Sequence, residues 1–380
     1  MDVSTRIVAE ERVVAPALER ARLLPVDWLR GLVMVLMTVD HASSAFNAGR
    51  LVTDAPYLYV PGTPLPAAQF LTRWITHLCA PTFLVLAGYV LFLSVRRRQE
   101  RGEPEASTTR FIVTRGLLIA ALDPLWMVWA HERHLVLQVL YAIGMSFVAL
   151  AFLRRLPPLL LGALGLVLVV VDEGVARSLS SIGGAGHIAA TLTFVPGELG
   201  PFRVLYPLVP WLAMMLLGWA AGEIARRDPA RFARRLVLAG VLALAVFAAV
   251  RGLDGYGNGG LFRADGSWVQ WLHTAKYPPS LGYTACELGL AWLLLAALWN
   301  ANLPRWASAV LTPLGQSALF FYLLHKHLLQ LLSEAFGLHH HAGLEASYVA
   351  AALTIALLLP LCRAFHRYKQ AHPASWARFI

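Results

Sequence analysis

The sequence predicts an all-α, polytopic membrane protein with about ten transmembrane helices. Its 380 residues are 58% hydrophobic and 14% charged, whereas soluble domains carry roughly 25% charged residues. The apolar runs are too long and too weakly alternating for the strands of a membrane barrel, so helices are the expected spanning elements. Its formal net charge is +10, but the basic residues stand in short clusters between apolar runs. Membrane topology therefore explains them better than binding to nucleic acid does.

Ten apolar segments account for most of the chain, and basic or Pro/Gly-rich links separate them. We expect a cytoplasmic lead at 1–24, one membrane domain at 25–365 and a cytoplasmic tail at 366–380. The lead is polar, so the first apolar run is expected to serve as its own uncleaved insertion signal. The expected spans lie at about 25–47, 67–95, 110–130, 134–153, 157–174, 203–225, 233–251, 280–300, 308–335 and 345–364.

The basic clusters predict the orientation, because cytoplasmic loops are enriched in Lys and Arg. With the N-terminus inside, the clusters after the second, fourth, sixth and tenth spans all face the cytoplasm, and so do both termini. The protein is therefore expected to be a multi-pass protein of the inner (plasma) membrane. Three long links at 47–66, 175–202 and 252–279 then lie outside. The sequence leaves open whether the protein forms a homodimer.

Polar residues inside the first two spans are the main functional signal. Arg30 and His41 are eleven residues apart, so they lie on one stripe of a helix, about 16 Å apart along its axis. Arg30 is then near the cytoplasmic interface and His41 in the outer half. Arg73 and His77 share a face in the outer half of the second span. Ionisable groups at this depth are costly to insert, and they commonly mark functional sites.

Other spans and links add polar side chains at the same depth, which predicts a cavity in the outer half of the bundle. Asp123 and Gln138 approach it from the third and fourth spans. The remaining contributors are Lys276, Tyr277, Tyr322, His325 and Lys326.

Each of these residues also has a structural interpretation, as a buried pair between helices or as a side chain that reaches the interface. We expect Asp40 to pair with Arg73, which leaves His41 free. The run at 339–341 is three histidines, but it has no matching carboxylate or cysteine spacing, so we predict a solvated turn and no metal site. The three cysteines show neither disulfide nor metal spacing.

Five motifs resemble a bacterial membrane family related to the catalytic domain of heparan-alpha-glucosaminide N-acetyltransferase, among the transmembrane acyltransferases. They are 27–41 (DWLRGLVMVLMTVDH), 73–88 (RWITHLCAPTFLVLAG), 115–117 (RGL), 276–280 (KYPPS) and 314–325 (LGQSALFFYLLH). The resemblance implies transfer of an acetyl or other acyl group from cytoplasmic acyl-CoA to a sugar amine or hydroxyl of an extracytoplasmic glycan. It makes acetyl-CoA a cosubstrate and implies no bound cofactor.

The resemblance and the chemistry together suggest roles for individual residues. His41 would be the catalytic histidine, but the related enzymes have an essential histidine in the loop after the first helix, and here none lies between His41 and His77. Either His41 takes that role, or His77 does, or the chemistry differs. The histidine would serve as base or as acyl carrier, and Asp40 is the third catalytic candidate. Donor, acceptor or oxyanion contacts are expected from Arg30, Arg73, Lys276, Tyr277, Tyr322, His325 and Lys326.

Two alternatives use the same sequence features. A transporter or proton-coupled permease would use the buried polar cluster as a relay, but we find no internal symmetry of the kind common in transporters. A purely structural membrane protein would leave several intramembrane charges unexplained. The aromatic residues Trp268, Trp271, His273 and Tyr277 of an outer link also suit a sugar, although such residues are more often found in the interfacial belt.

Overall fold

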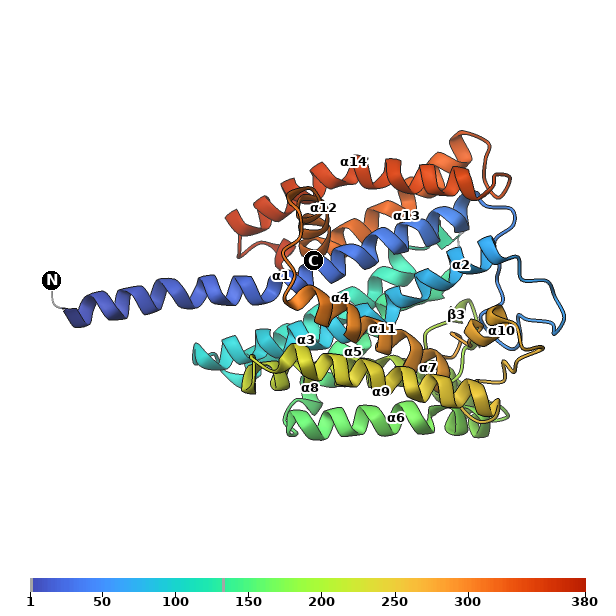
Figure 1. Cartoon of the computed structure of the whole chain (residues 1–380), viewed down its shortest axis with the longest axis horizontal. Coiled ribbons are helices and arrows are strands. Elements are labelled where there is room, and N and C mark those ends of the chain that lie inside the picture. The colour runs from blue at the N-terminus through green and yellow to red at the C-terminus, as the bar shows by residue number, and fades with distance from the viewer. Residues whose placement is uncertain (1–2, 132–133) are drawn as a thin grey trace.

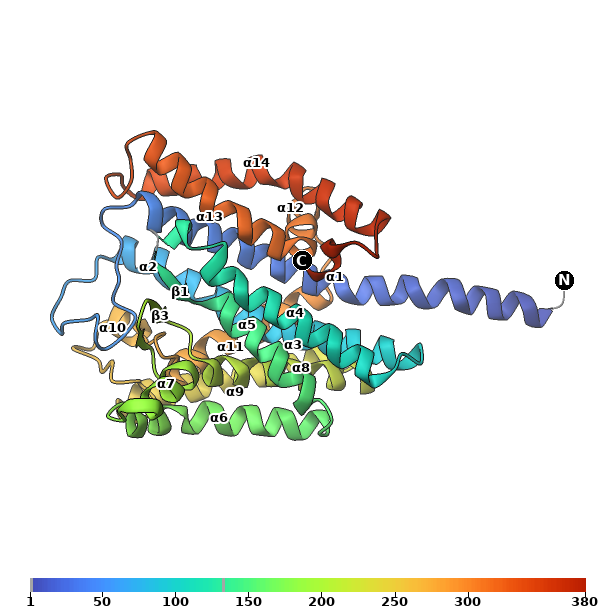
Figure 2. The ribbon, with the colours of Figure 1, turned by 180° about the vertical axis from the view of Figure 1, so that it is seen from behind.

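The long helices run side by side along one axis and form a single bundle (Figures 1 and 2). The computed structural model describes residues 3–131 and 134–380, with side chains from residue 23 onward except for His131. The long helices are α1 (Val3–Phe46), α3 (Cys79–Glu100), α4 (Glu105–Leu125), α5 (Val139–Leu153), α6 (Pro158–Leu179), α8 (Leu208–Arg227), α9 (Phe232–Leu253), α11 (Leu281–Trp299), α13 (Ala318–Ala335) and α14 (Leu344–Ala371).

The prediction of an all-helical polytopic membrane protein is confirmed. Among the described residues, six helical stretches are long and apolar enough to cross a membrane, and a bent pair of helices would make a seventh. One of the six joins α3 to the preceding α2 (Ala67–Ile75) and the 3₁₀ turn η1 (Thr76–Leu78). The number ten stays a prediction, because α1 and α4 carry several charges and α5 has only 15 residues.

The expected single span at 308–335 is instead two helices. The first, α12 (Arg305–Gln316), meets α13 at an angle of 93°. Pro313 inside α12 has no N–H to continue the helical ladder, and Ser317 leaves the helical conformation at φ −118° and ψ 29°. The bend turns α12 across the bundle, where it packs on α1, so α13 alone runs along the bundle axis.

Short elements replace the loops that were expected at one end of the bundle. The chain between α6 and α8 forms α7 (Gly184–Thr193) and two strands, and a third strand precedes α5. The strand order is β1-β3-β2, with β1 parallel and β2 antiparallel to β3. The strands are β1 (Leu135–Leu137), β2 (Gly197–Leu199) and β3 (Phe202–Val204), and the remaining short helices are η2 (Trp129–His131), α10 (Trp268–Leu272) and η3 (Trp376–Phe379).

Glycines let the central helices approach closely. A Cβ at Gly88 of α3 would meet the backbone of Met215 in α8, and a Cβ at Gly218 of α8 would meet the backbone of Val85 in α3. The two backbones therefore touch where larger residues would separate them. In contrast, α6, α9 and α14 are mostly exposed and apolar, as expected for helices that face lipid.

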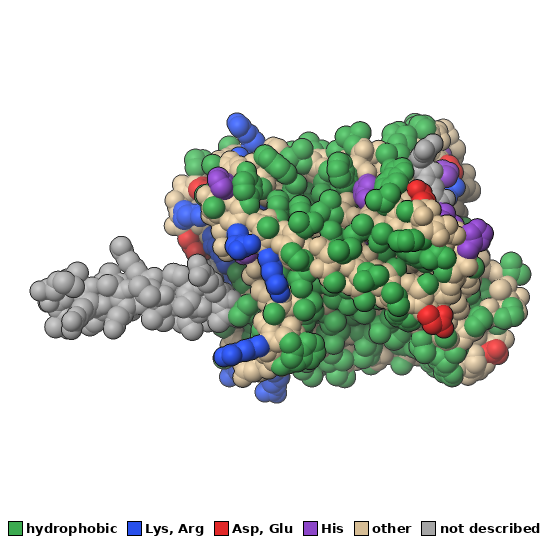
Figure 3. Space-filling model, turned by 90° about the horizontal axis from the view of Figure 1, so that it is seen from above, with side chains coloured by type: hydrophobic (Ala, Val, Ile, Leu, Met, Phe, Trp, Pro, Cys, Tyr) green, Lys and Arg blue, Asp and Glu red, His purple; other side chains and the backbone are tan. Residues whose placement is uncertain are grey.

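The charge distribution distinguishes the two ends of the bundle. The basic clusters after α3, α5, α8 and α14 lie at the end from which α1 projects (Figure 1), which we call the basic end. Figure 3 shows Lys and Arg side chains gathered toward this end and apolar side chains over much of the flank. This arrangement supports the predicted orientation, with the basic end in the cytoplasm.

Candidate functional site

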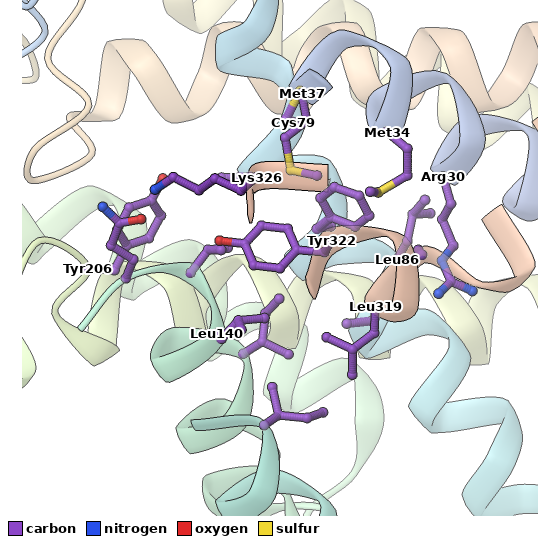
Figure 4. A pocket seen from close by; sticks show the side chains of 18 of the residues that line it. Arg30, Met34, Met37, Cys79, Leu86, Leu140, Tyr206, Leu319, Tyr322 and Lys326 are labelled. Carbon is purple, nitrogen blue, oxygen red and sulfur yellow. The ribbon is translucent and has the colours of Figure 1, made fainter. Parts of the chain in front are cut away.

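One elongated cavity of about 400 Å³ runs through the bundle. Both Arg30 and His41 line it, and their spacing on α1 corresponds to about 16 Å. Figure 4 shows Arg30 on one side of the cavity and Lys326 and Tyr206 on the other, with Tyr322, Leu319 and Leu140 between them. The cavity therefore extends from the basic end of the bundle into its opposite half.

The part of the cavity at the basic end is cationic. Arg30, Arg115 and Lys369 line it, from α1, α4 and α14, and we call these three residues the basic mouth. Arg30 lies 3.8 Å from Asp27, whose other carboxylate oxygen accepts a hydrogen bond from Gln316 at 3.1 Å. The Nε of Arg115 is buried without a hydrogen-bond partner. Lys369 already donates to an oxygen of Ile380 at 3.0 Å, and Ile380 also lines the cavity. An anion would satisfy the remaining donor of Arg115.

The middle of the cavity is apolar. Met34 of α1, Leu86 and Val90 of α3, Phe147 of α5 and Leu319 of α13 line this section. Apolar walls of this kind exclude water and accept a flexible chain or an acyl group.

The far chamber, at the other end of the cavity, is built around His41. The Nδ1 atom of His41 lies 2.6 Å from Nε2 of His325, and Nδ1 of His325 lies 3.1 Å from the carbonyl oxygen of Phe321. His41 lines the cavity, whereas His325 is fully buried behind it. Tyr322 also lines the cavity, with its ring 6.2 Å from that of His41 and inclined by 70°.

A charged network forms another wall of the far chamber. One carboxylate oxygen of Asp40 accepts hydrogen bonds from Arg50 at 2.8 Å and from Arg73 at 2.7 Å. Arg73 also donates to Asp54, through Nε at 2.8 Å and through Nη2. His77 places Nε2 3.4 Å from the same Asp54 oxygen. The predicted pair between Asp40 and Arg73 is thus present, but it belongs to a larger network.

The Asp54 carboxyl is ionised within this network. Burial favours its neutral form, but the Arg73 guanidinium and the nearby His77 ring outweigh burial and hold the pKa of Asp54 well below its ordinary range. The carbonyl oxygen of Asp54 accepts a hydrogen bond from the backbone N–H of Lys276 at 2.7 Å. Asp54 therefore connects Arg73 to the loop that carries Lys276 and Tyr277, both of which line the cavity.

Arg251 organises that loop from within. It is fully buried at the end of α9 and donates to the carbonyl oxygens of Trp271 at 3.0 Å and Leu261 at 2.9 Å. It also donates to the side chain of Asn258 and the carbonyl oxygen of Gln270. One guanidinium thereby satisfies four acceptors of a loop that has little regular structure.

The structure separates the predicted site residues into two groups. Those that line the cavity are Arg30, Asp40, His41, Arg73, Lys276, Tyr277, Tyr322 and Lys326. His77 and His325 lie behind the wall, with exposed fractions of 3% and 0%. Asp123 is buried too and accepts the backbone N–H groups of Gln138 and Tyr141, so it caps the start of α5.

The suggested aromatic sugar surface is only partly present. His273 is buried, with Nε2 2.8 Å from the carbonyl oxygen of Thr53, and Trp271 stacks under the Arg263 guanidinium at 4.4 Å. Trp268 lies against Phe70. Of the four residues in this suggestion, Tyr277 alone lines the cavity. His273 is buried within the loop, whereas Trp268 is half exposed on its surface.

Four residues that line the cavity or support its wall are not among the predicted site residues, namely Arg50, Asp54, Arg115 and Arg251. Arg50 and Asp54 fall in a link whose Pro, Gly and Tyr content indicated only a loop. Their signal was charge of both signs directly after a span that already held Asp40. In the sequence, Arg115 stands out only as part of the 115–117 motif, and Arg251 only as the end of an apolar span.

The fold and the cavity define a polytopic membrane protein with a buried polar site reached from a cationic mouth. A family model described as "Heparan-alpha-glucosaminide N-acetyltransferase, catalytic" matches residues 22–250, more than half of the chain, and the chain belongs to this family. No curated protein matches the chain. The family indicates a membrane acetyltransferase-like function. The match includes His41, Arg73 and Arg115, whereas Lys276 and α13 lie beyond it.

Proposed function

We propose that the protein transfers an acetyl or other acyl group from cytoplasmic acyl-CoA to an amine or hydroxyl of an extracytoplasmic sugar. The observation that carries the proposal is one continuous cavity, which has the basic mouth at one end and His41 at the other. A donor that enters at one face and an acceptor that enters at the other would both need such a passage.

The basic mouth suits the donor. Coenzyme A carries several phosphate groups, and arginine is well suited to phosphate because its planar guanidinium donates two parallel hydrogen bonds. Arg30, Arg115 and Lys369 would hold these groups, and the apolar middle of the cavity would take the arm that ends in the thioester. The unpartnered Nε of Arg115 supports this assignment, because a buried donor without an acceptor is costly.

His41 is the residue we assign to the chemistry. Its imidazole would take the proton from the acceptor nitrogen or oxygen, which then attacks the thioester carbon. The carbon–sulfur bond breaks as the carbon–nitrogen or carbon–oxygen bond forms, and the proton passes from His41 to the departing thiolate. In a two-step alternative, His41 itself carries the acyl group between donor and acceptor. His77 is the weaker candidate because it lies behind Arg73 and Asp54, away from the cavity.

The far chamber would bind the acceptor and stabilise the oxyanion. Arg73, Lys326 and Tyr322 line it and carry hydrogen-bond donors. Arg50, Lys276 and Tyr277 add polar groups that a sugar would contact. The acceptor is then a glycan or amino sugar on the outer face of the inner membrane.

Transfer in proteoliposomes tests the proposal. Vesicles that hold the protein would receive acetyl-CoA labelled in the acetyl group on the basic-end side and a panel of amino sugars on the other. Label should move to a sugar, and His41→Ala should abolish this transfer while leaving the unfolding temperature in detergent nearly unchanged. A substrate that crosses intact, with no transfer of label, would indicate the permease alternative instead.

Donor binding provides a second test. Arg30→Ala and Arg115→Gln should each weaken coenzyme A binding about tenfold, as expected for the loss of one charge-assisted contact. Arg305→Ala is a matched control, because Arg305 starts α12 at the same end of the bundle but does not line the cavity. Unchanged affinity in both mouth variants would refute the assignment of the donor end.

A further inference from the structure

We infer that His325 is a positioning residue that holds His41 in one tautomer, with the proton on Nδ1 and the lone pair of Nε2 directed to the reaction. The inference rests on the proposed function in one respect, because that function makes His41 the group that reacts. The geometry of the two rings carries the rest.

The carbonyl oxygen of Phe321 determines the tautomer of His325. A carbonyl oxygen only accepts hydrogen bonds, and it lies 3.1 Å from Nδ1 of His325. Nδ1 must therefore carry the proton. A neutral imidazole has one N–H, so Nε2 of His325 holds a lone pair and can only accept.

His41 is then the donor in the contact between the two rings. Its Nδ1 lies 2.6 Å from Nε2 of His325, so the proton shared by this pair belongs to His41. The ring centroids are 4.9 Å apart and the planes are inclined by only 22°. The two facing nitrogens are thus much closer to each other than the two ring centroids are. The rings therefore meet edge to edge, which is the geometry of an in-plane hydrogen bond.

A protonated His325 would reverse this assignment, but its surroundings oppose the charge. His325 is fully buried between helices, and Phe321 stacks on it with ring centroids 5.1 Å apart. The nearest charged neighbour along the helix is Lys326, which carries the same sign. A buried imidazolium without a carboxylate partner is costly, so the neutral form is favoured.

The remaining nitrogen of His41 is available for chemistry. His41 lines the cavity, and the described residues provide no hydrogen-bond partner for its Nε2. With Nδ1 protonated, Nε2 holds the lone pair that a general base or an acyl carrier needs. Buried His325 thus plays the part that an orienting carboxylate plays behind the histidine of a hydrolase triad, where the wrong tautomer lowers kcat about 10⁴-fold.

Two substitutions separate an orienting role from simple packing. In His325→Gln, the side-chain oxygen can accept the Nδ1–H of His41 from a similar position. His325→Leu fills similar space but accepts nothing. His327→Leu is the matched control on the same helix, because His327 contacts the carbonyl oxygens of Leu323 and Trp126 and does not line the cavity.

Solid-state NMR of ¹⁵N-histidine protein in lipid tests the tautomer without any acyl transfer. The signals of His41 are those missing from a His41→Gln sample. We expect Nδ1 protonated and Nε2 bare in the wild type, in His325→Gln and in His327→Leu, and loss of this preference in His325→Leu. A wild-type His41 protonated on Nε2 would overturn the inference, whether or not the variants fold.

Transfer kinetics test the consequence. The Leu variant should lose about 10²- to 10⁴-fold in kcat at an unchanged KM for the donor, and the Gln variant should recover most of it. Full kcat in His325→Leu would overturn the positioning role. If the wild type shows the expected tautomer but transfers no acyl group to any acceptor, the proposed function fails and the tautomer assignment stands.

Discussion

Removal of the Asp54 carboxylate should destabilise the protein strongly through Arg73. The side chains of Arg73 and Asp54 are only 10% and 4% exposed, and Asp54 accepts two hydrogen bonds from the guanidinium. In Asp54→Ala, Arg73 would keep only Asp40, which Arg50 already shares. Breaking a buried pair by removing one partner costs about 3–5 kcal/mol, because the other charge is left uncompensated.

The contribution of the Asp54 carboxylate to the free energy of unfolding should be complete at neutral pH. The pKa of Asp54 is lower in the folded protein than the unfolded value of about 3.9. A depressed carboxyl pKa stabilises the fold at every pH above the unfolded value, and this contribution is lost as pH falls through the folded value. Asp54→Ala at pH 7 therefore measures the whole interaction.

Unfolding of detergent-solubilised protein by sodium dodecyl sulfate gives the free energy, and a double-mutant cycle with Arg73→Ala isolates the pair. The coupling energy should exceed about 1 kcal/mol. Glu198→Ala is the control, because Glu198 pairs with Arg203 on the surface, where the two side chains are 60% and 54% exposed. Such a pair contributes about 0–1 kcal/mol. A cost for Asp54→Ala no larger than this control, or a coupling energy near zero, would refute the reasoning.

Three further predictions concern the outer loop and the helix packing. Arg251→Met should lower the free energy of unfolding by at least about 3 kcal/mol, because four acceptors lose their shared donor. Limited proteolysis should cut the loop at 252–280 faster in this variant than in the wild type. Burial lowers the pKa of His273 below its ordinary value. The neutral ring therefore stabilises the fold fully above about pH 6.5, and this stabilisation is lost as pH falls. His273→Gln should flatten the fall in melting temperature between about pH 7 and 5. Gly88→Ala should cost at least about 1–3 kcal/mol, because its Cβ would overlap the backbone carbonyl oxygen of Met215 in α8.

Each of these predictions has an outcome that contradicts it, and the substitutions at His273 and Gly88 also have matched controls. For Arg251, unchanged proteolysis at 252–280 would show that the loop holds its shape without the guanidinium. For His273, the control is His372→Gln, because His372 is exposed directly after α14. If the melting temperature of His273→Gln depends on pH as it does in the wild type, the buried His273 ring is not the source of that dependence. For Gly88, Gly174→Ala on α6 should stabilise slightly, because the nearest atom to its Cβ is 3.6 Å away; equal effects at both glycines would contradict the close approach of α3 and α8.

The candidate site was predictable where one helix carries the information. Arg30 and His41 lie on the same stripe of α1 because eleven residues make about three helical turns, and both line the cavity. The pair between Asp40 and Arg73 could also be predicted, because two opposite charges at one depth in neighbouring spans have few other partners.

The roles of His77 and His325 were not separable from sequence. Both are histidines at the same membrane depth as His41, and nothing in the local pattern tells which faces a cavity. Rotation of each helix about its axis decides this, and rotation depends on how the whole bundle packs. Only the tertiary structure puts His325 behind His41 and His77 behind Arg73.

The sequence alone determined the helical class, the end of the bundle that carries the basic clusters and the stripe of α1 that Arg30 and His41 share. These follow from length, hydropathy and charge, which act locally along each span. Only the tertiary structure decided that α12 and α13 bend apart by 93°, that Asp54 and Arg251 shape the outer loop, and that one cavity joins the basic mouth to the far chamber. Contacts between side chains far apart in the chain determine these features, and no local pattern encodes them.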